Sequence, residues 1–117
     1  MAQPYNPFRE TLRDLLIERG FTTSIGNPDW MTFSKTVSGY SNPYESIRKF
    51  AAGEREPVSE AGARMMEAVA DALGVEPTVF VEYELWQARR QFDPREVGAE
   101  EALRNLERWA AIQRRRA

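Results

Sequence analysis

Apolar residues recur along the chain at intervals of three and four, which is the spacing of amphipathic α-helices. No segment alternates apolar and polar residues between turn signals, as a half-buried strand would. The sequence therefore predicts an all-α fold. The predicted helices cover residues 7–19, 28–38, 43–52, 60–73 and 77–92, with a last helix from residue 94 towards the end of the chain.

Helix starts are marked by a capping residue that directly precedes a proline. Such a pair fits a helix start because the capping side chain accepts a backbone N–H and proline needs no amide donor at the first position. Ser59 and Pro77 provide two further starts, and Gly20, Gly39, Gly53 and Gly74 provide stops. The four pairs are Asn6-Pro7, Asn27-Pro28, Asn42-Pro43 and Asp93-Pro94.

The apolar face of each predicted helix indicates the core. Trp30 and Phe33 could instead form a stacking platform for single-stranded nucleic acid, but their spacing with Val37 favours the core. The predicted core residues are Phe8, Leu12, Leu15, Leu16, Trp30, Phe33, Val37, Ile47, Phe50, Ala51, Ala63, Met66, Val69, Ala70, Leu73, Phe80, Tyr83 and Trp86.

The helix predicted from Pro43 to Ala52 has two different sides. Tyr44, Ile47, Phe50 and Ala51 form its apolar stripe, whereas Glu45, Ser46, Arg48 and Lys49 lie off the stripe. A short helix with polar and basic residues on its outer side fits the major groove of DNA. An ordinary surface helix of a small domain would have the same pattern, so this stretch alone leaves both interpretations open.

Composition limits the classes of protein that fit. The chain of 117 residues is 42% hydrophobic and 29% charged, which is ordinary for one globular domain. There is no run of 18 apolar residues and no apolar segment typical of a signal peptide, so we expect a cytoplasmic protein without a membrane partner. Cysteine and histidine are absent, which removes the commonest metal ligands and general bases. We therefore predict no enzyme activity, no catalytic residue, no metal and no cofactor.

Charge is distributed unevenly, although the net charge is only −2. Residues 1–58 contain seven basic and seven acidic side chains, and residues 59–96 contain four and eight. Residues 97–117 contain five basic and three acidic ones. This distribution allows a basic patch in the first half and is compatible with specific DNA binding.

The segment from Phe50 carries a resemblance to a known family. It reads FAAGEREPVSE and then MMEAVADALGVEPTVF. In this order the motifs resemble the lambda repressor/Cro-like helix-turn-helix regulators, also called the xenobiotic response element family. The resemblance covers about residues 8–80 and implies a five-helix DNA-binding domain. The chain departs from the family pattern in its longer first loop and in having Pro43 and Tyr44 at the start of the recognition helix.

The resemblance implies that the outer side of the helix from Pro43 enters the major groove. Arg48 would then pair with guanine, Glu45 would accept from cytosine, and Tyr44 would meet a phosphate or a thymine methyl group. Tyr44 could equally belong to the core. The implied DNA-binding residues are Thr32, Ser34, Lys35, Ser41, Asn42, Tyr44, Glu45, Arg48, Lys49 and Arg55.

The last helix lies outside the segment that resembles the family. Its apolar stripe contains Leu103, Leu106 and Ala110, with Trp109 beside it, and must be buried on the domain or on a partner. Residues 1–92 are thus predicted to form the helix-turn-helix domain, and residues 93–117 an additional C-terminal helix that dimerises. Packing of this helix on the fifth helix is the alternative.

Two functions remain open at this point. The first is a sequence-specific transcriptional regulator, most simply a repressor, that binds double-stranded DNA as a homodimer. The second is a protein-interaction module, such as an antitoxin or adaptor, that uses the acidic middle and the last helix. Glu54 with Glu56, or Glu82 with Glu84, could be paired carboxylates of an enzyme, but a solvated surface is the simpler interpretation.

Overall fold

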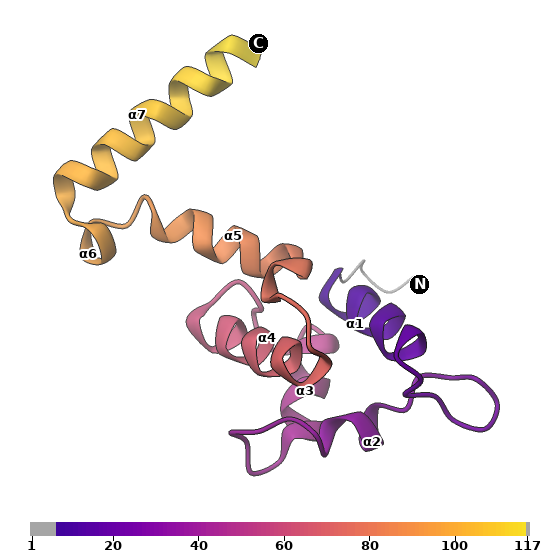
Figure 1. The fold of residues 1–117 in the computed structure, drawn as a ribbon. Coiled ribbons are helices and arrows are strands. Elements are labelled where there is room, and N and C mark those ends of the chain that lie inside the picture. Colours follow the sequence, from indigo (N-terminus) through magenta and orange to yellow (C-terminus); the bar gives the residue numbers. More distant parts are fainter. Residues whose placement is uncertain (1–6, 117) are drawn as a thin grey trace. The chain divides into compact units, whose positions relative to one another are not determined.

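The computed structural model describes residues 7–116, without the side chain of Arg116. In these residues it contains seven α-helices, one 3-10 helix and no strand, and an isolated bridge joins Thr22 to Pro28. The prediction of an all-α fold is confirmed. The helices are α1 (Pro7–Glu18), α2 (Trp30–Ser34), α3 (Pro43–Ala51), α4 (Glu60–Leu73), η1 (Pro77–Val79), α5 (Val81–Arg90), α6 (Pro94–Val97) and α7 (Ala99–Arg116) (Figure 1).

The chain forms two compact units that divide within α5. The first unit ends at Glu84 and the second begins at Leu85. The predicted domain boundary after residue 92 falls later in the chain and stays a prediction.

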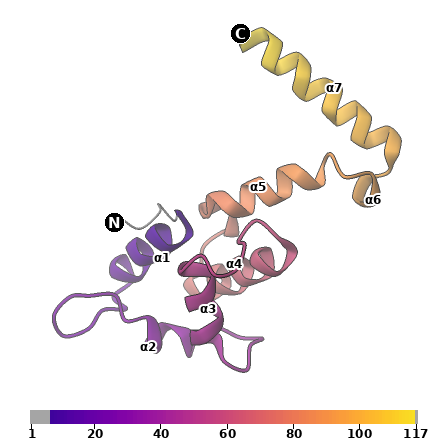
Figure 2. The same ribbon diagram turned by 180° about the vertical axis from the view of Figure 1, so that it is seen from behind.

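Helix α3 is the central element of the first unit. It contacts α1, α2 and α4, and Figure 2 shows these helices from the opposite side to Figure 1. Most of the predicted core is confirmed, although Leu15, Trp30 and Trp86 are only half-buried. The largest fully buried side chains are Phe8, Leu12, Leu16, Phe33, Met65, Met66, Val69 and Phe80.

Two pairs of aromatic rings pack in the first unit. The ring centroids of Phe8 and Phe80 are 5.1 Å apart, and those of Phe21 and Phe33 are 5.3 Å apart. Phe80 is fully buried, as predicted. Tilted and edge-on ring pairs of this kind add to the stabilisation from apolar burial.

Glu82 has a structural role that the sequence did not indicate. It was expected on a solvated surface, but it is buried, and its Oε2 accepts the backbone N–H of Phe8 at 2.8 Å. The first N–H groups of a helix have no partner within the helix, so this carboxylate satisfies one of them in α1. The predicted cap of α1, Asn6, lies outside the described residues.

Two predicted helix caps of the first unit are confirmed. Asn42 Oδ1 accepts the N–H of Glu45 at 3.3 Å, and Ser59 Oγ accepts the N–H of Gly62 at 3.0 Å. Gly74 ends α4 in the left-handed conformation, with φ +69°, which glycine adopts without steric cost. These local signals explain why α3 and α4 begin and end where the sequence predicts.

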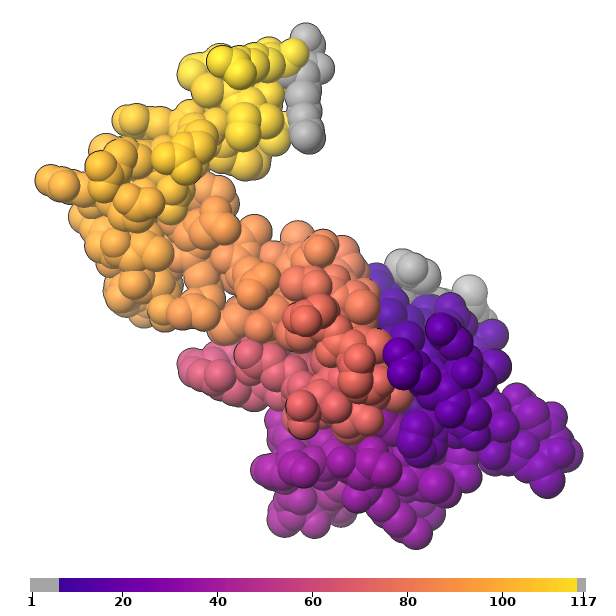
Figure 3. Space-filling view, in the orientation of Figure 1, coloured from indigo at the N-terminus to yellow at the C-terminus, as the bar shows by residue number. Residues whose placement is uncertain are grey.

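The predicted helix over residues 28–38 is wrong in extent. Pro28 takes part in the bridge with Thr22, and the N–H of Asp29 donates to the carbonyl of Phe21 at 2.8 Å. The loop from residue 22 to residue 28 therefore folds back on itself and projects from the first unit (Figures 1 and 3). Asp29 is the actual cap, since its carboxylate accepts the N–H of Thr32 at 3.1 Å.

The last two predicted helices are each divided in the structure. Phe80 separates η1 from α5 with an extended backbone, φ −91° and ψ 121°. Gly98 separates α6 from α7 with φ +87°. In both places a start signal is correct, at Pro77 and at Pro94, but the helix that it starts is short.

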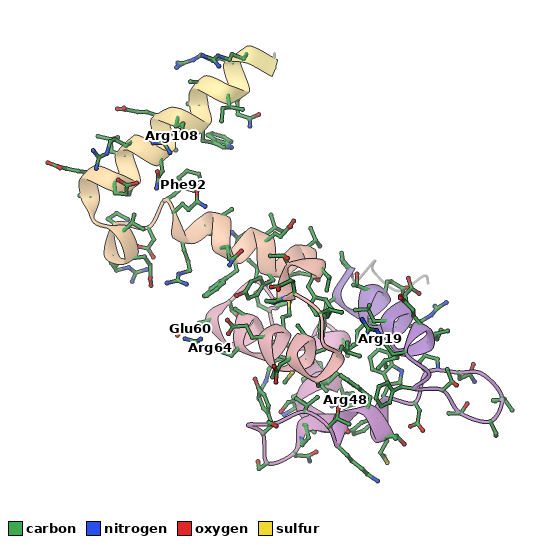
Figure 4. The ribbon with its side chains drawn as sticks, in the orientation of Figure 1. Arg19, Arg48, Glu60, Arg64, Phe92 and Arg108 are labelled. Carbon is green, nitrogen blue, oxygen red and sulfur yellow. The ribbon has the colours of Figure 1, made fainter. Side chains whose placement is uncertain are left out.

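The second unit contains α6 and α7, which contact each other, and the C-terminal part of α5. Ala102 of α7 is buried, and the Asn105 side chain donates to the carbonyl of Gln91 at 2.7 Å. The rings of Phe92 and Trp109 meet edge-on, with centroids 6.4 Å apart (Phe92 is labelled in Figure 4). One side of α7 is thus covered by the segment that directly follows α5.

Candidate nucleic-acid interface

Helix α3 has the two sides that the sequence predicts, except that Tyr44 of the predicted apolar stripe is exposed. Ile47, Phe50 and Ala51 are buried and face the neighbouring helices. Arg48 is exposed and Lys49 is half-exposed. Residues three and four apart share a side of a helix, so the buried and exposed sets follow directly from the sequence.

The start of α3 presents polar and aromatic groups to solvent. Ser41 and Asn42 are both exposed, and Asn42 also caps the helix. Tyr44 is 37% exposed, so its side chain lies at the surface and is not a core residue. Its position in the predicted apolar stripe is therefore not borne out, and the side chain is accessible to a partner.

Arg48 is held by two carboxylates. Its Nη2 lies 2.7 Å from Glu45 Oε1 and its Nε lies 3.1 Å from Glu45 Oε2. The same Nη2 lies 3.3 Å from Oε2 of Glu54, which is in the loop after α3 (Arg48 is labelled in Figure 4). Charge-assisted, two-point pairs of this kind fix the orientation of a guanidinium group.

The ion pair shifts the pKa values of Glu45 and Arg48 in opposite directions. The hydrogen bond from Arg48 lowers the pKa of the Glu45 carboxyl below its ordinary value. The hydrogen bonds and charges of Glu45 and Glu54 raise the pKa of Arg48 further above its already high value. Glu45 and Arg48 therefore both carry full charge at neutral pH, and the outer side of α3 is a mixed-charge surface.

Helix α2 contributes fewer candidate contacts than predicted. Ser34 is only 2% exposed, and its hydroxyl donates to the carbonyl of Met31 at 2.7 Å. Because this hydroxyl is buried and already bonded, the expectation that Ser34 contacts a phosphate is wrong. Thr32 and Lys35 are exposed, although the Thr32 hydroxyl donates to Asp29 Oδ2 at 2.8 Å.

The same bonding affects Asp29. The backbone N–H of Thr32, together with its hydroxyl, lowers the pKa of the Asp29 carboxyl. The carboxylate is therefore the form that caps α2. Asp29 is a structural residue at the edge of the candidate interface.

The loop after α3 brings Arg55 and Glu54 beside the helix. Gly53 has φ +78°, and the N–H of Glu54 donates to the carbonyl of Lys49 at 2.9 Å. The N–H of Gly53 donates to the carbonyl of Phe50 at 3.2 Å, which completes a Schellman turn. Arg55 is exposed, with its guanidinium carbon 6.0 Å from the centroid of the Phe50 ring.

Glu54 is the residue of this surface that the sequence analysis missed. It was grouped with Glu56 as a solvated pair, yet it joins Arg48. A signal existed in the sequence: a glycine at the end of a helix predicts a turn that returns the next residue towards the last helical turn. The side chain at position 54 was therefore placed beside position 48 by Gly53.

The other chemical alternatives find little support. Phe33 is fully buried, so it cannot form a stacking platform with Trp30. Within residues 7–116, no group of three His, Cys, Asp or Glu side chains could hold a metal ion. No helix of this range combines the length and the apolar composition needed to cross a membrane.

The candidate dimer residues of α7 differ in exposure. Leu103 is 56% exposed and Leu106 is 48% exposed, and Ala110 is half-buried. Trp109 is half-exposed because only part of its ring meets Phe92. Leu103 and Leu106 thus remain on the surface, although α7 also packs within its own unit.

Comparison of the chain with protein-family models, with curated proteins and with solved structures gives no match.

Proposed function

We propose that this chain is a sequence-specific DNA-binding regulator in which α3 reads the major groove. The observation that carries this proposal is the arrangement of α3. Its apolar side is covered by three helices, while Tyr44, Arg48 and Lys49 remain accessible on the other side. The resemblance to the lambda repressor/Cro-like family adds support, because that family uses the corresponding helix for base contacts.

The accessible residues suit two kinds of contact with DNA, one to base edges and one to the phosphate backbone. Arg48 has the planar donor group that recognises guanine, and Lys49 and Arg55 can approach phosphates. Lys35 and Thr32 extend the surface towards α2, and Ser41 and Asn42 extend it at the start of α3. Base contacts would then come from the middle of α3, and backbone contacts from its surroundings.

The charge of the first unit supports selective rather than indiscriminate binding. Residues 1–84 contain eight basic and thirteen acidic side chains, a net charge of −5. The negative net charge opposes attraction of the whole unit to DNA, so non-specific binding should be weak. Binding would depend on the local contacts of α3.

We also propose that the regulator is a homodimer whose copies meet through α7. Exposed Leu103 and Leu106 provide an apolar contact that can be buried. The first half of α7 contains Glu100, Glu101 and Glu107, whereas Arg114 and Arg115 lie near its end. An antiparallel pair of α7 helices would therefore place acidic side chains opposite basic ones, which suits a two-fold contact.

Selection from a random pool of double-stranded DNA tests the proposal directly. The purified chain should enrich a sequence with two related half-sites, and its affinity for that sequence should fall steeply as salt is raised. Recovery of no preferred sequence would count against DNA recognition.

A protein-interaction module is the second candidate, and the exposed apolar residues of α7 favour it. Trp109, Leu103 and Leu106 could bind a different protein instead of a second copy. Such a module would show no salt-dependent affinity for DNA. The DNA selection and a measurement of the oligomeric state together separate the two candidates.

A further inference from the structure

We propose that Glu45 and Glu54 act in opposite directions on Arg48: Glu45 positions its guanidinium for base reading, and Glu54 competes with the base. This inference rests on the proposed function, because it assigns roles within the α3 surface that would meet DNA. It identifies two carboxylates, one on the helix and one in the following loop, as determinants of recognition.

The two carboxylates occupy different N–H donors of the Arg48 guanidinium. A guanidinium has five N–H donors in a fixed plane, one on Nε and two on each terminal nitrogen. Glu45 accepts from Nε and Nη2, so it occupies the side edge of the group. Glu54 accepts from Nη2 as well and therefore approaches the second hydrogen of that nitrogen.

One edge of the Arg48 guanidinium remains for a base. Guanine presents O6 and N7 in the major groove, and arginine reads them with two parallel donors. With the side edge held by Glu45, the end edge formed by Nη1 and Nη2 is the pair available for a base. Nη1 makes no hydrogen bond to any residue from 7 to 116, so only the Glu54 contact obstructs this edge.

Backbone structure holds both carboxylates near Arg48. The Schellman turn at Gly53 ties the backbone of Glu54 to the carbonyl of Lys49, one residue beyond Arg48. Glu45 lies three residues before Arg48 on the same side of α3. Both carboxylates are therefore held by backbone structure, but only Glu45 lies within the helix that would enter the groove.

Solvent exposure makes the competing contact displaceable. The side chains of Arg48 and Glu54 are 42% and 52% exposed. Exposed ion pairs are weak and screened by salt. A guanine in the correct position can thus replace the single 3.3 Å contact of Glu54. Glu45 is 39% exposed as well, but it holds Arg48 through two bonds, at 2.7 and 3.1 Å, on the other edge and can stay bonded.

Neutral isosteres of the two carboxylates test the inference on the selected DNA sequence. Glu54→Gln should bind about two- to fivefold more tightly than the unmodified chain, because Arg48 no longer has to leave an ion pair. Glu45→Gln should bind less tightly, by roughly fivefold, and should lose the preference for guanine at one position, because Arg48 is no longer oriented.

Glu56→Gln is the matched control, since it removes the same charge from the same loop. The Glu56 carboxylate accepts the N–H of Val58 at 3.0 Å, and a glutamine side chain keeps an acceptor there. The gain of Glu54→Gln should exceed that of Glu56→Gln, and it should disappear when Arg48 is replaced by alanine. That last comparison measures the coupling between Glu54 and Arg48.

The outcomes distinguish this inference from the proposed function. If the chain selects a DNA sequence but Glu54→Gln and Glu56→Gln behave alike, Glu54 is not a competitor of the base. If Glu45→Gln strengthens binding as much as Glu54→Gln does, the two carboxylates act only through charge and the inference is wrong. If the unmodified chain selects no DNA sequence, the proposed function fails and the inference fails with it.

Discussion

The two units of this chain differ in how they use their apolar residues. In the first unit, eight large side chains are almost completely buried, and they come from α1, α2, α4 and the segment around Phe80. Among the described side chains of the second unit, Ala102 is the buried apolar residue, while Leu103, Leu106, Trp109 and Ile112 are exposed. Both units expose some large apolar side chains, but the first unit also has a packed core of buried ones, whereas little of the second unit's apolar surface is buried.

The two units also differ in net charge. The first unit carries a net charge of −5, and residues 85–117 carry eight basic and five acidic side chains, a net charge of +3. A recognition surface on the first unit must therefore work through particular residues and not through bulk charge. The two units should consequently respond differently to substitution.

Replacement of Phe80 by alanine should have the largest effect. Phe80 is fully buried against Phe8, so its loss should lower the free energy of unfolding by about 3–5 kcal/mol. A domain of this size has only about 5–15 kcal/mol in total, so chemical denaturation followed by circular dichroism will detect the change.

Val79→Ala is the control for this substitution. Val79 is the neighbouring residue but is 42% exposed, so we expect a change of less than about 0.5 kcal/mol. Equal unfolding midpoints for Phe80→Ala and the unmodified chain would contradict the description of the first unit as a packed core.

Local signals made much of the first unit predictable. The bounds of α4 follow from Ser59 and Gly74, and the two sides of α3 follow from the spacing of Ile47, Phe50 and Ala51. These features depend on neighbours in the sequence, which is why a single sequence reveals them.

Features that depend on pairing across a loop or on tertiary packing were not predictable. Nothing near Pro28 in the sequence reveals that it pairs with Thr22 instead of starting a helix. Ser34 lies beside polar neighbours, yet the packing of α2 buries it. Glu82 reads as a surface carboxylate because its partner, the N–H of Phe8, lies far away in the sequence.

Replacement of Gly62 by alanine should have the next largest effect. A Cβ atom at this position would overlap the carbonyl oxygen of Pro57, which is a backbone atom that cannot simply rotate away. Overpacking of this kind costs about 1–3 kcal/mol, and it should outweigh the gain of about 1 kcal/mol from removing a helix glycine. Thermal unfolding should therefore show a less stable protein.

The adjacent Ala61→Gly variant provides the comparison. Ala61 is exposed in the same turn of α4, so its replacement should cost about 1 kcal/mol through helix propensity alone. A Gly62→Ala variant that is more stable than the unmodified chain would show that the loop from Gly53 to Ser59 is not packed against α4.

Substitution of the exposed leucines should separate stability from assembly. Leu103→Ser combined with Leu106→Ser should change the unfolding free energy of the monomer by less than about 1 kcal/mol, since both side chains are on the surface. The same double variant should dissociate the proposed dimer, as measured by sedimentation over a range of concentrations. Arg108→Gln, on another side of α7, should leave the oligomeric state unchanged. An unmodified chain that is monomeric throughout would refute the proposed α7 contact.

The smallest effect concerns pH and compares one carboxyl group from each unit. The pKa of Glu45 is lowered mainly by the hydrogen bond from Arg48, and that of Asp93 is lowered mainly by the backbone N–H of Arg95. A depressed folded-state pKa means that each contact contributes above the pKa of the unfolded chain and is lost as the pH falls through the folded-state value. In a carboxyl NMR titration, Arg48→Ala should therefore raise the pKa of Glu45 towards its ordinary value and leave that of Asp93 unchanged. If the pKa of Glu45 does not move, Arg48 is not bonded to it in solution, and the positioning role assigned to Glu45 cannot hold.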